Sequence, residues 1–457
     1  MAVAHDVLAL IGNTPVVRVK SLDTGLCNLY LKLEHQNPGG SIKDRIALSM
    51  IEAAEEAGTL PPGGTIIEAT AGNTGLGLAL VASQKKYKLR LVIPDKMSKE
   101  KILHLRALGA RIIMTRSDVG KGHPEYYQDL AETIAARENL FYVDQFRNPA
   151  KSLAHETSTG PEIHRQMGSS LDAIVCGVGS GGTITGLSRY FARAAPSVQF
   201  VLADPAGSIL ADFIRTGVVR TDAGSWLVEG IGEDFIPAIA DLSRVHHAYT
   251  VTDAESFAIA RELLSHEGLL VGSSTGTLVS AALQFCREQK EPKNVLTFVC
   301  DSGNKYLSKM YNDYWMADHG FLPRSAQGDL RDLISRRFED ILTIGPTDTL
   351  ATAISKMKLY DVSQLPVITD ETLLGIVDES DLLLALYRDP QKESLLQIRE
   401  IMTNRLETLP PNAPLEAVLD LFKRGLVAII KEGDRFLGLV TPIDVITFLR
   451  QKARPDL

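Results

Sequence analysis

Residues 177–183 read G-V-G-S-G-G-T, and they lie between an apolar run at residues 173–178 and a helical pattern at residues 183–194. The segment is therefore expected to be a turn that leads from a buried strand into a helix. Its small residues expose backbone N–H groups, which suit one terminal phosphate. The spacing also matches G-x-G-x-x-G, and Asp204 follows about 20 residues later, where a dinucleotide-binding unit places its ribose acid. Both interpretations stay open on this segment alone.

The same strand-to-helix unit recurs through the first two thirds of the chain. Strands are expected at residues 28–34, 65–67 and 90–93, followed by helices at residues 46–57, 74–83 and 99–108. Apolar strands separated by helices are typical of a mainly parallel sheet covered on both faces, in an α/β protein. In such a sheet the strand-to-helix junctions lie together at the carboxyl edge, where ligands bind.

Three further junctions of this kind carry glycine and polar side chains. They read N-P-G-G-S-I-K-D-R at residues 37–45, E-A-T-A-G-N-T-G at residues 68–75 and V-G-S-S-T-G at residues 271–276. Lys43 stands at the start of a helix capped by Ser41, although the helix dipole disfavours a cation there. It is either a solvated lysine or an amine kept reactive for Schiff-base chemistry. The other two junctions suit an anion, or they are tight turns with capped helices.

The composition limits the class of protein. The chain has 457 residues, a net charge of −8, 45% hydrophobic residues and 23% charged residues, values typical of a soluble protein with about three globular units. No basic cluster suits nucleic acid, and no apolar run is long enough to span a membrane. We expect no metal site and a cytoplasmic location, because the four cysteines form neither a metal-binding nor a disulfide pattern and no secretory signal begins the sequence: Cys27, Cys176, Cys286 and Cys300.

The last third of the chain contains an internal duplication. Residues 343–354 resemble the segment that begins at residue 408, and residues 374–382 resemble residues 437–445. The stretch before it, residues 318–328, has no periodicity and contains Gly, Pro and Ser, so we interpret it as a linker.

Together these motifs are similar to those of the pyridoxal-phosphate enzymes of fold type II, the tryptophan-synthase-like family. L-I-G-N-T-P at residues 10–15 and G-G-S-I-K-D-R at residues 39–45 carry the resemblance. Within that family the whole chain resembles the cystathionine β-synthases, including D-Q-F-R-N at residues 144–148 and E-G-I-G at residues 229–232. The duplicated tail resembles the paired CBS domains (a Bateman module) of those enzymes. The implied division is a catalytic domain at residues 1–320, a linker at 321–335, and CBS domains at 336–395 and 396–457.

The resemblance implies a role for particular residues. Lys43 would be the Schiff-base lysine and the general base, Asn73 would bind the 3′-oxygen of the cofactor, and Ser274 would meet its pyridine nitrogen. The phosphate would be held by the glycine-rich loop, which consists of Gly179, Ser180, Gly181, Gly182 and Thr183. The substrate would be bound by Thr70, Gly72, Thr74, Gln145 and Gly232.

The implied reaction is β-replacement through an aminoacrylate, in which L-serine and L-homocysteine give L-cystathionine and water. Alternatives within the family are cysteine synthase, which uses O-acetylserine and sulfide, and hydrogen-sulfide-producing β-replacement of cysteine and homocysteine. Outside it, a nicotinamide oxidoreductase would account for one junction, and a catalytically idle adenosyl sensor would account for the tail.

The sequence departs from the family pattern at two positions of the catalytic part. Ala71 replaces a frequent serine, and Glu233 stands where many animal relatives have tyrosine. A carboxylate at position 233 would either repel an approaching thiolate or receive its proton. The haem-binding N-terminal extension of the animal enzymes has no counterpart, so we expect no haem. His155 is interpreted as a surface or helix histidine.

The nucleotide signature of the family is kept in the second copy of the tail, by Thr441 and Asp444. In the first copy Asp378 and Glu379 would repel phosphates, so S-adenosylmethionine or another adenosyl ligand is more compatible than ATP or AMP. Alternatively, the tail only mediates contacts between subunits. Relatives are at least dimers, so the expected assembly is a homodimer or a higher homo-oligomer.

Overall fold

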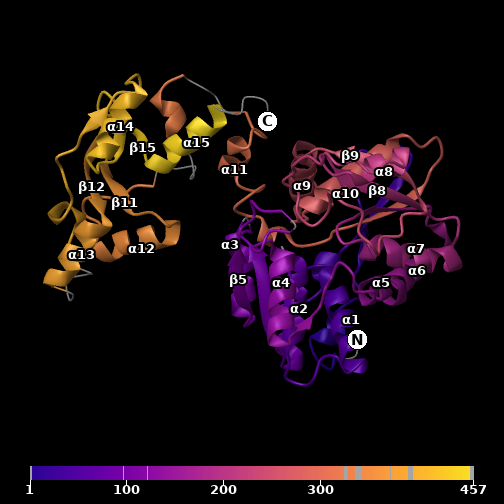
Figure 1. Cartoon of the computed structure of the whole chain (residues 1–457). Helices are drawn as coiled ribbons and strands as arrows, with labels where there is room; N and C mark the ends of the chain where they lie inside the picture. Colours follow the sequence, from indigo (N-terminus) through magenta and orange to yellow (C-terminus); the bar gives the residue numbers. More distant parts are fainter. Residues whose placement is uncertain are drawn as a thin grey trace. The chain divides into compact units, whose positions relative to one another are not determined.

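The computed structural model describes residues 3–70, 72–95, 97–120, 122–323, 328–334, 342–370, 372–389 and 395–452. The chain divides into two compact units, Met1–Tyr311 and Asn312–Leu457 (Figure 1). Ala71 and parts of the predicted linker and of the predicted CBS domains, at residues 324–327, 335–341, 390–394 and 453–457, lie outside the described residues. The domain boundaries at residues 320, 335 and 395 stay predictions.

The first unit contains two sheets. Their strands are β1 (Val16–Arg18), β2 (Asn28–Lys32), β3 (Thr65–Ala69), β4 (Lys88–Pro94), β5 (Arg111–Thr115), β6 (Phe141–Tyr142), β7 (Ala173–Gly177), β8 (Gln199–Pro205), β9 (Val245–Val251) and β10 (Asn294–Phe298). One sheet has the order β1-β2-β10-β7-β8-β9, and the other has the order β5-β4-β3-β6. Only β1 runs antiparallel to its neighbour among these pairs. The predicted α/β class with mainly parallel sheets is therefore confirmed.

Helices connect and cover these strands. They are α1 (Lys43–Glu56), α2 (Asn73–Lys85), α3 (Lys99–Ala107), α4 (Tyr127–Glu138), α5 (Ala150–Ala154), α6 (Gly160–Met167), α7 (Gly182–Ala194), α8 (Leu210–Thr216), α9 (Asp253–Glu267) and α10 (Ser273–Arg287), with short helical turns η1 (Leu8–Leu10), η2 (Glu34–Gln36), η3 (His155–Thr159), η4 (Gly168–Ser170) and η5 (Gly303–Lys305). Among them η3 is a π-helical turn between α5 and α6, a local widening that often marks functional sites.

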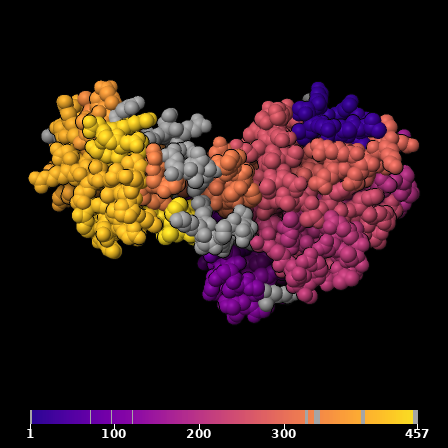
Figure 2. All heavy atoms as spheres, turned by 90° about the horizontal axis from the view of Figure 1, so that it is seen from above, coloured from indigo at the N-terminus to yellow at the C-terminus, as the bar shows by residue number. Residues whose placement is uncertain are grey.

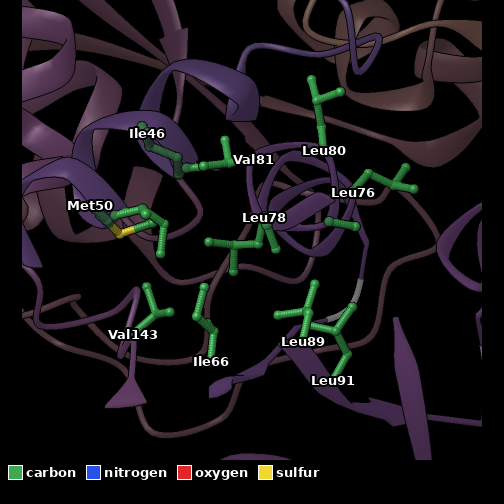
Figure 3. Packing of buried hydrophobic residues seen from close by; sticks show 14 of the residues in the cluster. Ile46, Met50, Ile66, Leu76, Leu78, Leu80, Val81, Leu89, Leu91 and Val143 are labelled. Atoms are coloured by element: carbon green, nitrogen blue, oxygen red, sulfur yellow. The ribbon is translucent and has the colours of Figure 1, made fainter. Parts of the chain in front are cut away.

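Helix α2 is the centre of one hydrophobic core. Figure 3 shows Leu76, Leu78 and Val81 of this helix among apolar side chains of α1 and of the four-stranded sheet. Gly77 lets α1 approach, because a Cβ there would lie 2.9 Å from the carbonyl oxygen of Lys43. The packing of α2 thus fixes the position at which α1, and with it Lys43, begins.

The N-terminal segment closes one edge of the six-stranded sheet. In Figure 2 these residues (indigo) lie on the surface of the first unit beside much later segments drawn in pink to orange. Strand β2 pairs with β10, and the backbone N–H groups of Lys20 and Ser21 donate to Glu267 at 2.8 and 2.7 Å. Residues distant in sequence are therefore joined in this unit.

The second unit contains one sheet of order β11-β12-β15-β14-β13. Its elements are α11 (Asp313–Asp318), η6 (Leu330–Leu333), α12 (Leu350–Tyr360), β11 (Gln364–Thr369), β12 (Thr372–Asp378), α13 (Glu379–Arg388), η8 (Ile398–Glu400), β13 (Thr408–Leu409), α14 (Leu415–Lys423), β14 (Ala428–Glu432), β15 (Arg435–Val440) and α15 (Pro442–Lys452). The hairpins β11–β12 and β14–β15 are each followed by a helix, as the duplication predicts.

Each copy of the duplication has its own hydrophobic core. Leu330 and Leu333, which fall in the predicted linker, are buried in the core of the second copy. Their spacing places both side chains on one face of the short helix η6. This part of the predicted linker is therefore packed structure.

Candidate active site

The four glycine-rich junctions meet at one small cavity. Ile42 and Lys43 line it from the start of α1, Asn73 from α2 and Ser274 from α10. The glycine-rich loop contributes the rest of the predicted cofactor set to the same wall: Gly179, Ser180, Gly181, Gly182 and Thr183. The structure thus brings together all the residues that the sequence assigned to cofactor binding.

Lys43 is the first residue of α1, and its backbone N–H donates to Ser41 Oγ at 3.2 Å. Among the described residues its Nζ has no hydrogen-bond or ion-pair partner. Burial lowers the pKa of the Lys43 amine, while Cys300, Asp301 and Glu233 act in the opposite direction. A buried amine with a lowered pKa is more readily neutral, which a nucleophilic lysine requires.

The glycine-rich loop is a cradle that only small residues can form. Gly181 has φ +84°, and a Cβ there would lie 2.7 Å from Ala240 Cβ. A Cβ at Gly179 would lie 2.6 Å from the carbonyl oxygen of Gly230. The backbone N–H groups at the start of α7 lie in this loop and receive no side-chain cap, so they suit a phosphate dianion. The residues present therefore fit pyridoxal phosphate, with an amine and a phosphate cradle on one cavity.

Asn73 is held by two residues that the sequence did not reveal. Its side-chain nitrogen donates to Asp301 Oδ2 at 2.8 Å, and its side-chain oxygen accepts from Lys305 Nζ at 2.8 Å. Tyr306 also donates to Asp301 Oδ2, at 2.8 Å. Because these partners lie more than 200 residues further along the chain, no local pattern indicated them. They fix the orientation of the amide at the cavity wall.

A larger cleft of about 530 Å³ adjoins the small cavity, and Lys43 lines both. All the predicted substrate residues line this cleft: Thr70, Gly72, Thr74, Gln145 and Gly232. Thr74 Oγ1 donates to Gln145 Oε1 at 2.7 Å, and Gln145 Nε2 donates to the carbonyl oxygen of Ala69 at 3.1 Å. Ala71, the first departure from the family pattern, lies outside the described residues.

A carboxylate held between two lysines, Glu229, lines both this cleft and the small cavity. Glu229 accepts from Lys101 Nζ, and from Lys309 Nζ at 2.6 Å. Burial alone would raise the pKa of Glu229, but Lys101 and Lys309 hold it below its ordinary value. Glu229 belongs to the E-G-I-G motif, but no local pattern indicated Lys101 or Lys309, which lie 128 and 80 positions away in the sequence.

His155 was expected to be a surface or helix histidine; it lies in the helical turn η3, but the expected surface position is wrong. Its side chain is buried and lines the small cavity. Nδ1 lies 2.9 Å from Thr159 Oγ1, and Nε2 lies 3.2 Å from Thr183 Oγ1. Burial, followed by the positive charges of Arg45, Lys43 and Lys151, lowers its pKa well below the ordinary value. His155 is therefore a neutral link between η3 and the phosphate cradle.

Lys151 is a second buried lysine near the cradle. Its Nζ donates to the carbonyl oxygen of Ser180 at 2.5 Å, and a Cβ at Gly182 would lie 2.8 Å from its Cγ. Burial, and then the positive charge of Lys43, lowers the pKa of Lys151 to about 7. No spacing in the sequence indicated Lys151, because its partner Ser180 lies in the glycine-rich loop 29 positions further along the chain.

Asp204, the residue that suggested a nicotinamide site, has a structural role. It is buried, and its Oδ2 accepts from the backbone N–H of Ala211 at 2.8 Å, in the first turn of α8. It lines neither the small cavity nor the cleft. The geometry therefore favours the single phosphate over the dinucleotide.

In the second unit the residues of the nucleotide signature act as helix caps. Thr441 N–H donates to Asp444 Oδ2 at 2.8 Å, and Asp444 is 5% exposed. In the first copy Asp378 and Asp381 form a reciprocal capping box at the start of α13. No group of three or more His, Cys, Asp or Glu residues that could hold a metal, and no helix able to cross a bilayer, occurs in the described part of the chain.

Comparisons with known proteins agree with this geometry. The family model of pyridoxal-phosphate dependent enzymes matches residues 7–301, and the CBS domain model matches residues 330–388 and 398–451. Cystathionine β-synthase of Dictyostelium discoideum is 35% identical, over 99% of this chain and 94% of its own length.

Similar solved structures cover about two thirds of this chain. A hydrogen sulfide-producing enzyme from Fusobacterium nucleatum is 36% identical with a TM-score of 0.61, over 67% of this chain and 98% of that one. An O-acetylserine dependent cystathionine β-synthase from Helicobacter pylori is 36% identical with a TM-score of 0.61, over 68% of this chain and 99% of that one. This chain therefore belongs to the cystathionine β-synthase family of pyridoxal-phosphate dependent enzymes, as a lyase of β-replacement chemistry that carries two CBS domains.

Proposed function

We propose that this enzyme condenses L-serine with L-homocysteine to give L-cystathionine and water, the reaction of transsulfuration. The observation that carries the proposal is the position of Lys43, whose side chain lines both the small cavity and the larger cleft. The amine thus stands between a place for the cofactor and a place for the substrates. The relative named cystathionine β-synthase also matches along the whole chain, tail included.

The small cavity would hold pyridoxal phosphate. When bound, this cofactor supplies an electrophilic carbonyl for the substrate amine and a ring that accepts the electron pair released at the substrate Cα. The backbone N–H groups of the cradle would hold the phosphate: Gly179, Ser180, Gly181, Gly182 and Thr183. Asn73, fixed by Asp301 and Lys305, would bind the 3′-oxygen.

Ser274 would meet the pyridine nitrogen. It is 4% exposed and lines the small cavity from the first turn of α10. A hydroxyl holds a proton on that nitrogen less firmly than a carboxylate does, so the ring withdraws electrons more weakly. This favours prompt loss of a β-leaving group over a long-lived carbanion.

The larger cleft would orient the first substrate. Thr70, Gly72, Thr74 and Gln145 would bind the carboxylate of serine. The bond between Thr74 and Gln145 keeps both side chains in place before the substrate arrives, which lowers the entropy lost on binding.

Lys43 would move the proton of the substrate Cα. Its lowered pKa lets the neutral amine take this proton, and the resulting ammonium returns it once the sulfur has added. The bond from the serine Cβ to its hydroxyl breaks, and the bond from Cβ to the homocysteine sulfur forms. The thiol proton and the hydroxyl leave together as water.

A second candidate is cysteine synthase or a hydrogen-sulfide-producing β-replacement. The similarity of the first unit to the Fusobacterium nucleatum and Helicobacter pylori enzymes favours it. Both candidates share the cofactor residues, so the leaving group and the thiol distinguish them.

The visible spectrum of the purified protein tests the proposal. With serine alone the cofactor band should shift, and it should return when homocysteine is added, while mass spectrometry detects cystathionine. Lys43→Ala should abolish both the shift and the product. If serine leaves the band unchanged and O-acetylserine with sulfide moves it, the second candidate replaces the first. The same spectrum should contain no Soret band, since we propose that the enzyme holds no haem.

We also propose that the CBS pair binds S-adenosylmethionine or another adenosyl ligand, through Thr441 and Asp444. Asp444 Oδ1 is buried without a hydrogen-bond partner, which supports a ribose hydroxyl as its donor. Calorimetry on the full chain should detect binding of S-adenosylmethionine and none of ATP.

The assembly and location are part of the same proposal. We expect a homodimer or a higher homo-oligomer, which sedimentation would detect. The four cysteines are free thiols in the structure, which supports the cytoplasm as the compartment. We expect no nucleic acid or membrane partner.

A further inference from the structure

The larger cleft opens into a second hollow of about 770 Å³, and four side chains line both spaces. These are Tyr127, Phe146, Trp226 and Glu233, which we term the neck. We term this second space the outer hollow; a molecule that extends from the cleft into it lies against three aromatic rings and one carboxylate. All four residues belong to the first unit.

The backbone of Glu233 is fixed on both sides. Its N–H donates to Ser208 Oγ at 3.0 Å, and its carbonyl oxygen accepts from the Ile209 N–H at 3.1 Å. By contrast, its carboxylate has no hydrogen bond or ion pair with any residue that the structure describes. The main chain therefore presents a carboxylate that the protein itself does not satisfy.

The positive charges near Glu233 do not compensate for its burial and for the neighbouring negative charge. Burial, followed by the negative charge of Asp234, raises the pKa of Glu233 to about 8, although Lys151 and Lys43 act in the opposite direction. Lys151 Nζ already donates to Ser180, and Lys43 is committed to chemistry at the cofactor. A cation that entered the neck would stabilise the ionised carboxylate.

Aromatic rings beside a carboxylate are the usual surroundings of a bound ammonium. The faces of Trp, Tyr and Phe attract cations, and the attraction grows when water is excluded. The neck offers such rings on α4 and in the loops that carry Phe146 and Trp226, beside one carboxylate. Sulfide and acetate would gain nothing from this combination, whereas an ammonium would gain from both parts.

The two substrates use their amines differently. The amine of serine reacts at the cofactor carbonyl, so it lies near Lys43 and cannot reach the neck. The thiol of the second substrate must reach the same centre, while its α-ammonium, several bonds away, can extend towards the neck. Only the second substrate can therefore place an ammonium between the cleft and the outer hollow.

We propose that the neck binds the α-ammonium of the thiol-bearing amino acid, with Glu233 as its anion, and so selects an amino-acid thiol over sulfide. This rests on the proposed function and names how its second substrate is recognised. Glu233 then serves neither to repel a thiolate nor to receive its proton.

The test compares two thiols that differ only in the ammonium, homocysteine and 4-mercaptobutyrate. The loaded enzyme is assayed with saturating serine, and the ratio of kcat/KM for the two thiols is measured. Loss of a charge-assisted contact in Glu233→Gln should lower this ratio by about ten-fold or more, mainly through the KM of homocysteine. Trp226→Leu should lower it by about two- to five-fold, because one cation–π partner is lost. Phe146 is less suited to this test, since Lys151 Nζ already lies 5.8 Å from the centre of its ring.

Asp234→Asn is the matched control. It removes the same charge from the next residue, which lines the outer hollow but not the cleft. Because Asp234 raises the pKa of Glu233, its loss favours the ionised carboxylate, so the ratio should stay unchanged or rise and should not fall. An equal fall for both thiols in Glu233→Gln, or no fall for either, would overturn the proposal, since a proton acceptor affects every thiol. If serine proves not to be a substrate, the proposed function fails, and the same ratio measured with O-acetylserine still tests the neck.

Discussion

The strand-to-helix junctions of the two units differ in what satisfies their backbone donors. At the active site, α1, α2, α7 and α10 begin after residues that give them no side-chain cap. In the duplicated tail, Thr349 caps α12 and Asp378 caps α13. The first N–H groups of a helix need partners. The active-site helices leave donors for a ligand, although the N–H of Lys43 already donates to Ser41, whereas α12 and α13 satisfy theirs internally. A polar residue at a helix start is therefore not evidence of a binding site until its own hydrogen bonds are known.

A helix start whose backbone N–H groups are kept for a ligand must be stabilised by other contacts, and a buried ion network stabilises the start of α1. Arg45, two residues after Lys43, donates to Glu34 Oε2 at 2.7 Å and to Glu162 Oε2 at 2.8 Å, and all three side chains are buried. No comparable buried ion network occurs among the described residues of the tail. The first prediction concerns removal of Arg45 from this network.

Arg45→Met should destabilise the first unit by about 3–5 kcal/mol, because it leaves the buried carboxylate of Glu34 without its cation and that of Glu162 with Lys32 alone, at 3.1 Å. Denaturant unfolding of the cofactor-free protein measures the change. The control is Arg137→Met, which removes an exposed pair with Glu138 and should change stability by less than about 1 kcal/mol. Equal effects of the two variants would contradict the role of the network.

Acid unfolding sharpens the same prediction. Burial alone would raise the pKa of Glu162, but the hydrogen bonds and charge of Arg45 hold it at about 2. A lowered folded-state pKa stabilises the fold above the unfolded pKa, near 4.3, and this stabilisation is lost as pH falls towards 2. In Arg45→Met that loss between pH 5 and pH 2 should be smaller.

The second prediction fills the phosphate cradle. Gly181 has φ +84°, and in Gly181→Ala the new Cβ would lie 2.7 Å from Ala240 Cβ. The loop must therefore move, and its N–H groups no longer point at the phosphate. Overpacking and backbone strain together amount to about 3–4 kcal/mol, which corresponds to about 100- to 1000-fold weaker binding of pyridoxal phosphate. Titration of the cofactor-free protein, followed by the cofactor band, measures it.

Gly217→Ala is the matched control for the cradle. Gly217 also has a positive φ, +73°, but a Cβ there meets nothing within 4 Å. It should lower stability by about 1 kcal/mol and leave cofactor affinity unchanged. If it weakens the cofactor as much as Gly181→Ala does, general strain and not the cradle explains both.

The sequence predicted the junction residues because they follow local patterns of strand, small residue and helix. Lys43, Asn73, the loop at 179–183 and Ser274 were therefore found without a structure, and all line one cavity. The parts that were missed depend on contacts between distant segments. Asp301 meets Asn73 across 228 positions, and a buried charged residue of this kind has no periodicity that could reveal it.

His155 shows the same limit on a smaller scale. No local pattern around it indicates a site, but the π-helical turn η3 places it at the cavity wall. In the tail, the residues of the nucleotide signature also make hydrogen bonds at helix starts, which their spacing does not reveal, and their ligand stays a prediction. Sequence spacing predicts the position of a residue within a helix or strand, whereas tertiary contacts determine what its side chain binds.

The third prediction concerns His155→Gln. The variant should weaken pyridoxal phosphate binding by about ten-fold, because Thr183 and Thr159 lose the ring that links them and a buried polar group costs about 1–3 kcal/mol when unpaired. Cofactor titration measures it. The control is His164→Gln, which should leave the affinity unchanged. His164 Nδ1 lies 3.1 Å from the Tyr190 hydroxyl, and His164 does not line the cavity.

The pH dependence of His155→Gln has a definite sign. Because the pKa of His155 is lowered in the fold, the unfolded chain binds a proton near pH 6.5 that the folded chain does not. Wild-type stability should therefore fall as pH drops from 7 to 5, and it should fall less in the variant. Identical slopes would show that the ring is not buried neutral.

The smallest effects belong to the caps of the tail. Asp378→Ala and Thr441→Ala should each lower the stability of the second unit by about 1 kcal/mol, since each removes a side-chain bond at a helix start. Calorimetry of the full chain measures this, with and without S-adenosylmethionine. The ligand should stabilise wild type and Asp378→Ala equally but Thr441→Ala less, because only the second copy keeps the signature. Equal stabilisation of all three would mean that both junctions are caps and nothing more, and that the ligand binds elsewhere. In that case the capped helix starts of the tail would bind no ligand, whereas the uncapped helix starts of the active site would bind the cofactor.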